Sequence, residues 1–75
     1  MDKNRGPLAL SKCGVALYGT NWQKPLQRQL NVNDNRIKKW LNGDQIPEGV
    51  WSEIFALLKQ KQIDIEQVLN DLDAN

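Results

Sequence analysis

The chain has 75 residues, of which 40% are hydrophobic, and its ten lysines and arginines against nine acidic residues give a net charge of +1. It contains no histidine and one cysteine, Cys13, which excludes the usual zinc-site patterns and an internal disulfide. No apolar run approaches the roughly 18 residues of a membrane span, and the segment MDKNRGPLAL lacks the apolar region of a secretory signal.

Charge is distributed unevenly along the chain. Residues 1–43 hold eight lysines and arginines against two aspartates, a net charge of +6, whereas residues 44–75 hold two lysines against seven acidic residues, a net charge of −5. Such polarity turns one end of a molecule toward a polyanion and the other end away from it. We expect a single cytoplasmic domain over residues 1–75, with frayed ends at 1–5 and 73–75.

The first predicted helix begins near Pro7, a residue favoured at the first helical position, and ends before Gly19. Its apolar residues recur at i, i+3, i+7 and i+8, the spacing of one buried helix face: Leu10, Cys13, Leu17 and Tyr18. Gly14 weakens the helical pattern. We interpret Cys13 as a core residue, since the chain has no histidine to act as its catalytic base.

Two short helices joined by a tight turn are predicted over residues 22–43, WQKPLQRQLNVNDNRIKKWLNG. Leu26 and Leu30 lie one turn apart on the first of these helices, and Thr20 or Asn21 can cap its start.

Three consecutive residues specify the turn. Asn31 can adopt the left-handed conformation that ends the first helix of the pair, Val32 fills the corner, and Asn33 caps the second helix. Gly43 follows the last periodic residue as a stop, so the second helix is roughly nine or ten residues long.

This second helix has one apolar face and one polar, cationic face. On a wheel of about 3.6 residues per turn, Ile37, Trp40 and Leu41 fall on one side. The opposite side, flanked by Asp34 and Arg36, carries amide and cationic side chains: Asn35, Lys38, Lys39 and Asn42. Taken alone, such a run is often a solvated helix face, whereas behind a well-formed turn it suits phosphates and base edges.

A fourth and a fifth predicted helix complete the chain. Pro47 can open the fourth helix, whose apolar stripe is formed by Val50, Trp51, Ile54, Phe55 and Leu58. Asp64, with Gln67 three residues later, forms a capping-box arrangement that predicts the start of the fifth helix. The inner face of the fifth helix consists of Ile65, Val68, Leu69 and Leu72. The predicted fold class is therefore all-α, a compact bundle of about five short helices.

Neither catalysis nor single-strand stacking is favoured by the residues present. The chain has no Ser-His-Asp set and no glycine-rich phosphate loop, so we predict a non-enzyme without cofactor, metal or small-molecule ligand. The three tryptophans could stack on bases, but each lies on an apolar helix face and is interpreted as structural: Trp22, Trp40 and Trp51.

Residues 22–43 resemble the helix-turn-helix of lambda-repressor-like (Cro and xenobiotic-response-element type) DNA-binding proteins. The matching positions are Gln23, Leu26, Leu30, Val32, Asn33, Ile37, Trp40 and Gly43. The stretch ALYGTNW, residues 16–22, also looks like the lead-in of small bacterial and phage regulators of this type. Two residues depart from the family pattern, since Gln27 stands where a small alanine is usual and Asn31 replaces the usual glycine.

The resemblance implies a sequence-specific transcriptional regulator, expected to be a repressor, that binds a palindromic operator in double-stranded DNA as a homodimer through the major groove. The expected base contacts come from Asp34, Asn35, Arg36 and Lys39, although Asp34 can instead serve only the helix N-terminus. The expected phosphate contacts come from Gln23, Lys24, Arg28, Asn33, Lys38 and Asn42. Lys3 and Arg5 could add a mobile arm along the DNA backbone.

The last predicted helix leaves two functions open. Its apolar residues Ile65, Val68, Leu69 and Leu72 are the expected dimer interface, because one short helix on so small a core leaves part of this stripe exposed. The alternative is a protein-interaction module, antitoxin-like or an adaptor, that offers the same acidic helix to another protein.

Overall fold

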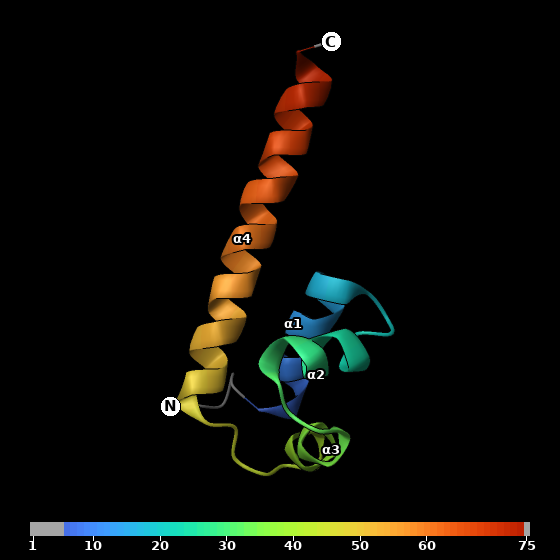
Figure 1. The fold of residues 1–75 in the computed structure, drawn as a ribbon, viewed down its shortest axis with the longest axis vertical. Coiled ribbons are helices and arrows are strands. Elements are labelled where there is room, and N and C mark those ends of the chain that lie inside the picture. Colours follow the sequence, from blue (N-terminus) through green and yellow to red (C-terminus); the bar gives the residue numbers. More distant parts are fainter. Residues whose placement is uncertain (1–5, 75) are drawn as a thin grey trace.

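The computed structural model describes residues 6–74 and contains four helices within them (Figure 1). They are α1 (Pro7–Tyr18), α2 (Gln23–Leu30), α3 (Asp34–Leu41) and α4 (Glu48–Asp73). No strand occurs in this part of the chain. The predicted all-α class is confirmed.

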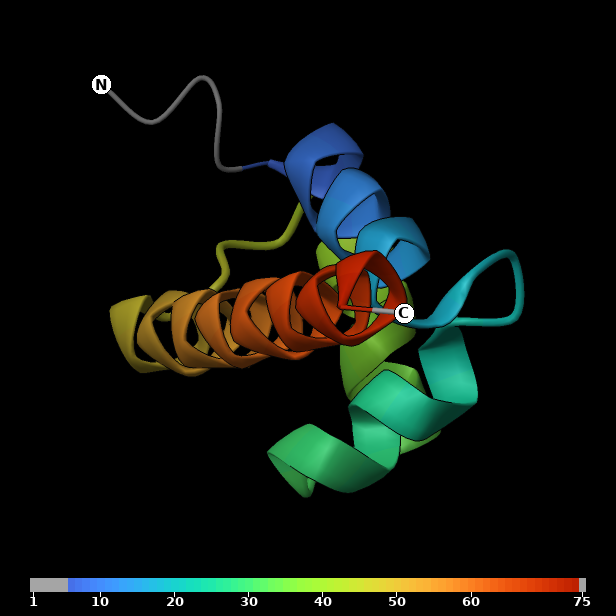
Figure 2. The ribbon, with the colours of Figure 1, turned by 90° about the horizontal axis from the view of Figure 1, so that it is seen from above.

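α1 lies at the centre of the helix packing. It contacts each of the other three helices, and α2 and α3 also pack against each other. α4 has 26 residues against eight in α3, and it extends far beyond the shorter helices, so that the described residues measure 47 × 27 × 19 Å. α3 and the C-terminal end of α4 therefore lie at opposite ends of the long axis (Figure 1), and the view from above has the end of α4 in front of the shorter helices (Figure 2).

The hydrophobic core draws on all four helices and on the segments between them. Its buried members are Leu10, Leu17, Trp22, Leu26, Leu30, Ile37, Trp40, Ile46, Trp51 and Ile54. Cys13 and Tyr18 pack against this cluster, as expected from the spacing of the first helix. The three tryptophans are all buried, which confirms their structural interpretation.

The ends of α1 follow the sequence signals. Pro7 occupies the first helical position, where its missing N–H is not needed. At the other end Gly19 has a φ of 85°, a positive value that glycine adopts without a Cβ clash, and its N–H donates to the carbonyl of Val15 at 2.8 Å.

Gly14 lies in the middle of α1 because the indole ring of Trp22 rests on its backbone. A Cβ built on Gly14 would overlap carbon atoms of that ring, and Trp22 is buried and has no open space to move into. Gly14 weakens the helical pattern of α1, but its missing side chain allows the start of α2 to pack closely against α1.

The expected fourth and fifth helices are one continuous helix, and the prediction of a separate fifth helix is wrong. Residues 59–63, KQKQI, contain no glycine or proline, and lysine and glutamine are good helix formers, so nothing interrupts α4. Asp64 lies inside the helix, where its Oδ1 accepts a hydrogen bond from Nε2 of Gln60 at 3.1 Å, and it does not form a capping box with Gln67.

Two smaller expectations also need correction. Phe55 is 62% exposed and does not join the core stripe of α4. Trp22, not Thr20 or Asn21, occupies the cap position of α2, and no side chain caps that helix. Asp73 is the last residue of α4, and residues 1–5 and 75 lie outside the described part of the chain.

The contact between Gly14 and Trp22 predicts the stability of two matched glycine variants. Gly14→Ala is expected to lower the free energy of unfolding by about 1–3 kcal/mol, because overpacking outweighs the gain in helix propensity. Gly49→Ala, in α4 with no atom within 4 Å of the new Cβ, should leave stability unchanged or raise it slightly. Urea denaturation followed by circular dichroism measures both, and equal stability of the two variants would contradict the packing of Trp22 on Gly14.

Candidate nucleic-acid interface

Asn31 makes the turn between α2 and α3. It has φ 58° and ψ 46°, the left-handed conformation expected for it, and it is the one non-glycine residue with positive φ in the described chain. Its N–H donates to the carbonyl of Arg28 at 3.2 Å, and the N–H of Val32 donates to the carbonyl of Gln27 at 3.1 Å. These bonds satisfy carbonyls at the end of α2. Val32 is half-buried against the core, in the corner where it was expected.

Asn33 caps α3 as expected. Its backbone is extended, and its Oδ1 accepts a hydrogen bond from the backbone N–H of Arg36 at 2.9 Å. The cap uses the side-chain oxygen, which leaves the amide Nδ2 of this exposed residue as its available donor.

α3 presents one face to the core and the other to solvent. Ile37 and Trp40 are buried and Leu41 is half-buried. Every residue expected to contact DNA from this helix and its two caps is exposed: Asn33, Asp34, Asn35, Arg36, Lys38, Lys39 and Asn42. Gly43, with a φ of 112°, follows the helix as the expected stop. The two faces of α3 therefore lie as the sequence pattern predicts.

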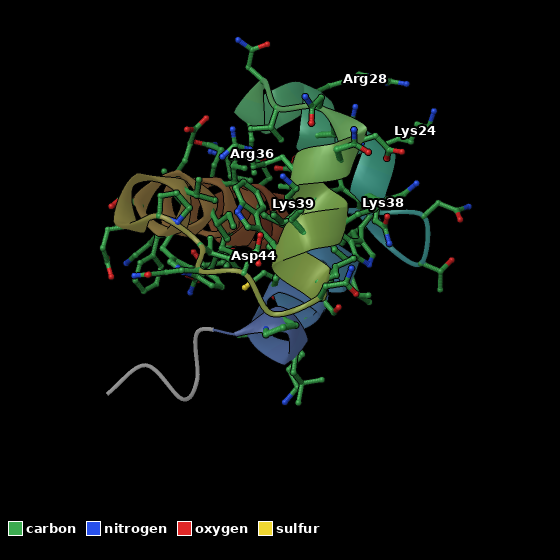
Figure 3. All side chains as sticks on the ribbon, turned by 90° about the horizontal axis from the view of Figure 1, so that it is seen from below. Lys24, Arg28, Arg36, Lys38, Lys39 and Asp44 are labelled. Atoms are coloured by element: carbon green, nitrogen blue, oxygen red, sulfur yellow. The ribbon has the colours of Figure 1, made fainter. Side chains whose placement is uncertain are left out.

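Positive charge gathers around the outer face of α3. Arg36, Lys38 and Lys39 project from α3, and Lys24 and Arg28 project from the neighbouring α2 (Figure 3). All five side chains are exposed. Asp34 is the one acidic residue within α2 and α3. The two helices together therefore carry a net charge of about +4.

Asp34 forms an ion pair inside α3. Its Oδ2 lies 3.3 Å from Nζ of Lys38, one helical turn away, and both side chains are more than half exposed. Such a pair contributes little to stability in water, on the order of 0.3–0.5 kcal/mol. It does hold the two side chains on the same flank of α3, and Asp34 in the first turn also interacts favourably with the helix dipole.

The start of α2 offers backbone donors to an anion. Gln23 and Lys24 are its first two residues, their N–H groups precede the first intrahelical hydrogen bond, and no side chain caps them. Pro25 follows with no N–H at all. A shallow hollow lined by Thr20, Asn21, Gln23 and Lys24 lies at this helix end. Gln23 thus combines a free backbone donor with an exposed amide side chain.

Gln27 is a polar residue of α2 whose side chain is partly buried. It is half-buried, and its Oε1 is buried with no hydrogen-bond partner among the described residues. A buried carbonyl oxygen without a partner costs about 1–3 kcal/mol. The partly buried side chain of Gln27 is therefore accommodated in α2 at an energetic cost.

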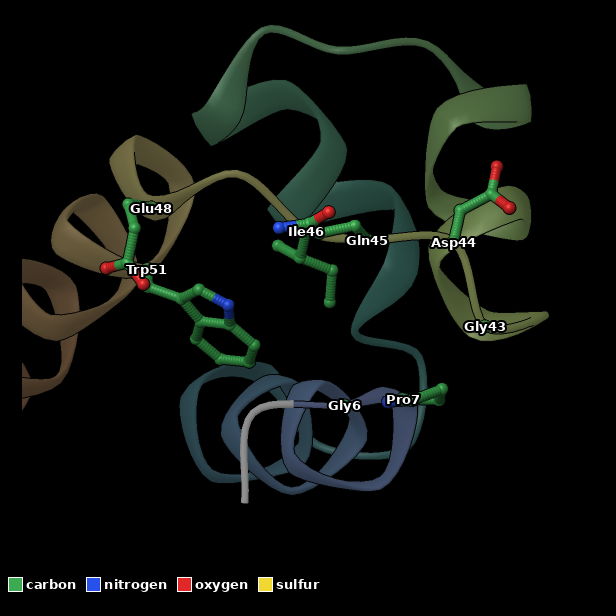
Figure 4. A pocket seen from close by; sticks show the side chains of 8 residues that line it. All are labelled: Gly6, Pro7, Gly43, Asp44, Gln45, Ile46, Glu48 and Trp51. Atoms are coloured by element: carbon green, nitrogen blue, oxygen red, sulfur yellow. The ribbon is translucent and has the colours of Figure 1, made fainter. Parts of the chain in front are cut away.

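A second hollow, of about 270 Å³, lies between the start of α1 and the loop that joins α3 to α4 (Figure 4). Ile46 and Trp51 extend toward α1 inside it.

No group of three or more histidine, cysteine, aspartate or glutamate residues that could hold a metal ion occurs among residues 6–74. The lone thiol of Cys13 is half-buried, and burial raises its pKa above the usual range, which keeps it neutral.

The residues expected at the dimer interface share one exposed face on the distal part of α4. Ile65, Val68, Leu69 and Leu72 are between 50% and 67% exposed. Lys3 and Arg5, expected as an arm, lie outside the described residues. None of the helices in the described part of the chain is long and apolar enough to cross a membrane.

Comparisons of the chain with known protein families, with curated protein sequences and with solved structures give no significant match.

The cap of α3 predicts different effects for two asparagines that lie two residues apart. Asn33→Ala is expected to lower the free energy of unfolding by about 0.5–2 kcal/mol, because the N–H of Arg36 loses its side-chain acceptor, while Asn33→Ser should restore most of this loss. Asn35→Ala, on the exposed face of α3, should leave stability unchanged within about 0.5 kcal/mol. Thermal and urea denaturation of the four chains, wild type included, measures these effects. Equal losses for both alanine variants would exclude the cap.

Proposed function

We propose that the chain is a sequence-specific, double-stranded DNA-binding transcriptional regulator in which α2, the turn and α3 form a helix-turn-helix. The observation that carries this proposal is the division of α3 into a buried apolar face and a polar, cationic face at one end of the molecule. A helix of this kind fits the major groove, and its positive surroundings attract the phosphate backbone.

The first turns of α3 supply the base contacts in this proposal. Asn35 can make a bidentate contact to adenine, while Arg36 and Lys39 can donate to guanine. Asp34 can accept from the amino group of cytosine, and its ion pair with Lys38 then keeps that lysine on the flank, toward the DNA backbone. All four base-contacting residues are exposed and lie within six consecutive positions.

The phosphate contacts surround these residues. Gln23 anchors one phosphate at the uncapped start of α2, where backbone donors and the helix dipole favour an anion. The remaining contacts come from exposed amide and cationic side chains: Lys24, Arg28, Asn33, Lys38 and Asn42. In this scheme the chain acts in the cytoplasm, needs no cofactor and catalyses no reaction.

A palindromic operator and a homodimer complete the proposal. One α3 helix contacts only a few base pairs, so two copies on adjacent half-sites gain both affinity and specificity. Binding across a promoter would exclude the polymerase, which makes repression the mode of regulation that we propose.

A second candidate function, a protein-interaction module, is favoured by one specific observation. Ile65, Val68, Leu69 and Leu72 form one exposed apolar face on the distal part of α4, and acidic residues flank them: Asp64, Glu66, Asp71 and Asp73. A basic amphipathic helix of another protein would fit this surface. The two functions differ in their DNA binding, since an adaptor would bind duplexes weakly and without sequence preference.

Salt tests the DNA-binding proposal. Roughly five to eight cationic side chains per dimer should release counterions, so the logarithm of the association constant should fall with the logarithm of salt concentration by about 0.9 per phosphate neutralised. Binding is measured on a duplex selected from a random library, between about 50 and 200 mM salt, where we expect a loss of at least tenfold. A loss below about threefold would exclude this interface, and loss of binding on adding EDTA would reveal a metal requirement that the proposal lacks.

Alanine variants should separate base contacts from phosphate contacts. Asn35→Ala or Lys39→Ala is expected to cost about 1–3 kcal/mol on the selected duplex and to relax base preference at one position per half-site. Gln23→Ala should weaken binding to all duplexes alike, because it removes a phosphate contact. Lys59→Ala, an exposed lysine on α4, serves as the control for lost charge and should change neither property. An unchanged base preference in Asn35→Ala would show that α3 is not the recognition helix.

A further inference from the structure

The distal part of α4 carries an apolar surface that the described residues leave exposed. This surface, called here the distal stripe, consists of Ile65, Val68, Leu69 and Leu72. Lys61 and Asp64 border its lower end, where a shallow apolar groove runs along the helix. Soluble chains of this size seldom expose several large aliphatic residues side by side unless another molecule binds there.

Carboxylates border the distal stripe on both sides. On a helix of about 3.6 residues per turn, Asp64 and Asp71 fall on one flank of the stripe. Glu66 and Asp73 fall on the opposite flank by the same count, and all four residues are exposed. The distal part of α4 is therefore an apolar strip between two acidic edges.

The acidic edges are unfavourable for the free helix. α4 ends at Asp73, and its last turn contains no basic residue. The C-terminal end of a helix carries a partial negative charge, so carboxylates such as Asp71 and Asp73 are repelled by it, whereas cations are attracted. Such a conflict between a local rule and the sequence is expected where the residues serve binding. A cationic partner would turn the repulsion into attraction.

Charge also decides between the possible occupants of the stripe. The nearest lysine, Lys61, is engaged at the end of α1, where its Nζ donates to the carbonyl of Leu17 at 3.0 Å. Residues 62–75 contain four acidic residues and no lysine or arginine, a side-chain charge of −4. A second copy would set two such charges against each other, and an anionic lipid surface would be repelled in the same way. An amphipathic helix with cations beside its apolar face is attracted.

We propose that the distal stripe binds an amphipathic helix of another protein, with lysines or arginines on both sides of its apolar face. Apolar residues of the partner lie on the stripe, and its cations meet the two acidic edges. This assignment deepens the second candidate function by fixing the charge pattern of the partner, and it rests on α4 alone. Ile65 and Leu72 are about 10 Å apart along the axis, so the partner contributes two or three helical turns.

The stripe and the candidate nucleic-acid interface can be occupied at the same time. α3 lies at the opposite end of the long axis from the stripe, and the described residues measure 47 Å in that direction (Figure 1). A helix on the stripe therefore leaves α3 open. In this assignment the stripe is not the dimer interface expected from the sequence, and adjacent half-sites hold the two copies of the regulator together.

Binding at the stripe is weak and depends on salt. A contact of four apolar side chains buries a few hundred Å² in total, less than the roughly 1,200 Å² of a stable interface. We therefore expect a dissociation constant in the micromolar range. Because the charged edges are exposed, the affinity should fall at least about threefold between about 50 and 300 mM salt.

Synthetic peptides test the charge pattern of the partner. The probe is a helix about 14 residues long with leucines on one face and lysines on both sides of them. One control has glutamate in place of every lysine, and the other has the residues of the probe in an order that scatters the leucines around the helix. Fluorescence anisotropy with the full chain should give micromolar binding of the probe and at least about tenfold weaker binding of both controls. Equal binding of the lysine and glutamate peptides, or no binding of the probe up to about 1 mM, would overturn the proposal.

Matched variants of the chain locate the binding surface. Ile63 and Ile65 are 48% and 50% exposed, but their positions two residues apart place them on opposite faces of α4. Ile65→Ser should weaken binding of the lysine peptide at least about fivefold, whereas Ile63→Ser should leave it within about twofold. Glu66→Gln should weaken it about two- to fivefold, and Glu53→Gln, which removes an exposed carboxylate lower on α4, should not. Equal effects within either pair would overturn the proposal.

Two further measurements exclude other occupants. The wild-type chain should sediment as a monomer at the concentrations of the peptide assay, and it should not bind vesicles of phosphatidylcholine. A dimer that Ile65→Ser dissociates would assign the stripe to a second copy, and vesicle binding that Ile65→Ser abolishes would assign it to lipid. Either result would overturn the proposal. Circular dichroism checks that every variant keeps the helix content of the wild type.

Duplex binding separates failure of this proposal from failure of the proposed function. Ile65→Ser should bind the selected duplex like the wild type, because the stripe lies far from α3. A chain that binds the lysine peptide at the stripe but no duplex would support this proposal and exclude the DNA-binding function. A chain that binds the duplex with sequence preference but not the lysine peptide would overturn this proposal and leave DNA recognition intact.

Discussion

The contact between Trp22 and Gly14 is the constraint on which the arrangement of the shorter helices depends. α1 touches every other helix, and the absence of a side chain at Gly14 lets the indole at the start of α2 rest on its backbone. The position of α2 then determines, through the turn at Asn31, where α3 can lie. Because Ile37 and Trp40 fill the core beneath, the polar face of α3 can point only to solvent. A missing Cβ in α1 thus orients the candidate interface.

The molecule separates two surfaces of opposite character along its length. Cationic side chains surround α3 at one end, whereas α4 carries an acidic, apolar tip at the other. The separation has a physical benefit under the proposed function, because an acidic surface beside the DNA would repel phosphates. α4 is long enough to keep the two surfaces apart because residues 59–63 contain no helix breaker.

Local chemistry explains which elements could be predicted. Four residues determine the conformation of their immediate neighbours, through a fixed φ, a left-handed conformation or a single cap. The structure has each of them in its predicted role: Pro7, Asn31, Asn33 and Gly43. The errors arose where local signals compete with packing. Asp64 and Gln67 have the spacing of a capping box, but a continuous helix satisfies their backbone groups better than a new start would. Trp22 took the cap position of α2 because burying its ring against α1 outweighs a side-chain cap from Thr20 or Asn21.

The sequence by itself determined the helical class, the turn between α2 and α3, and the polar face of α3, because periodicity and turn chemistry depend on neighbouring residues alone. Tertiary structure decided the rest. It showed that Gly14 receives the ring of Trp22 and that Phe55 lies outside the core. It also showed that Nζ of Lys61 reaches the carbonyl of Leu17 in the last turn of α1, and that the apolar side chains of α4 beyond Leu58 are exposed. These features depend on residues far apart in the chain, up to 44 positions for Lys61 and Leu17, and no local pattern reports which distant surfaces will meet.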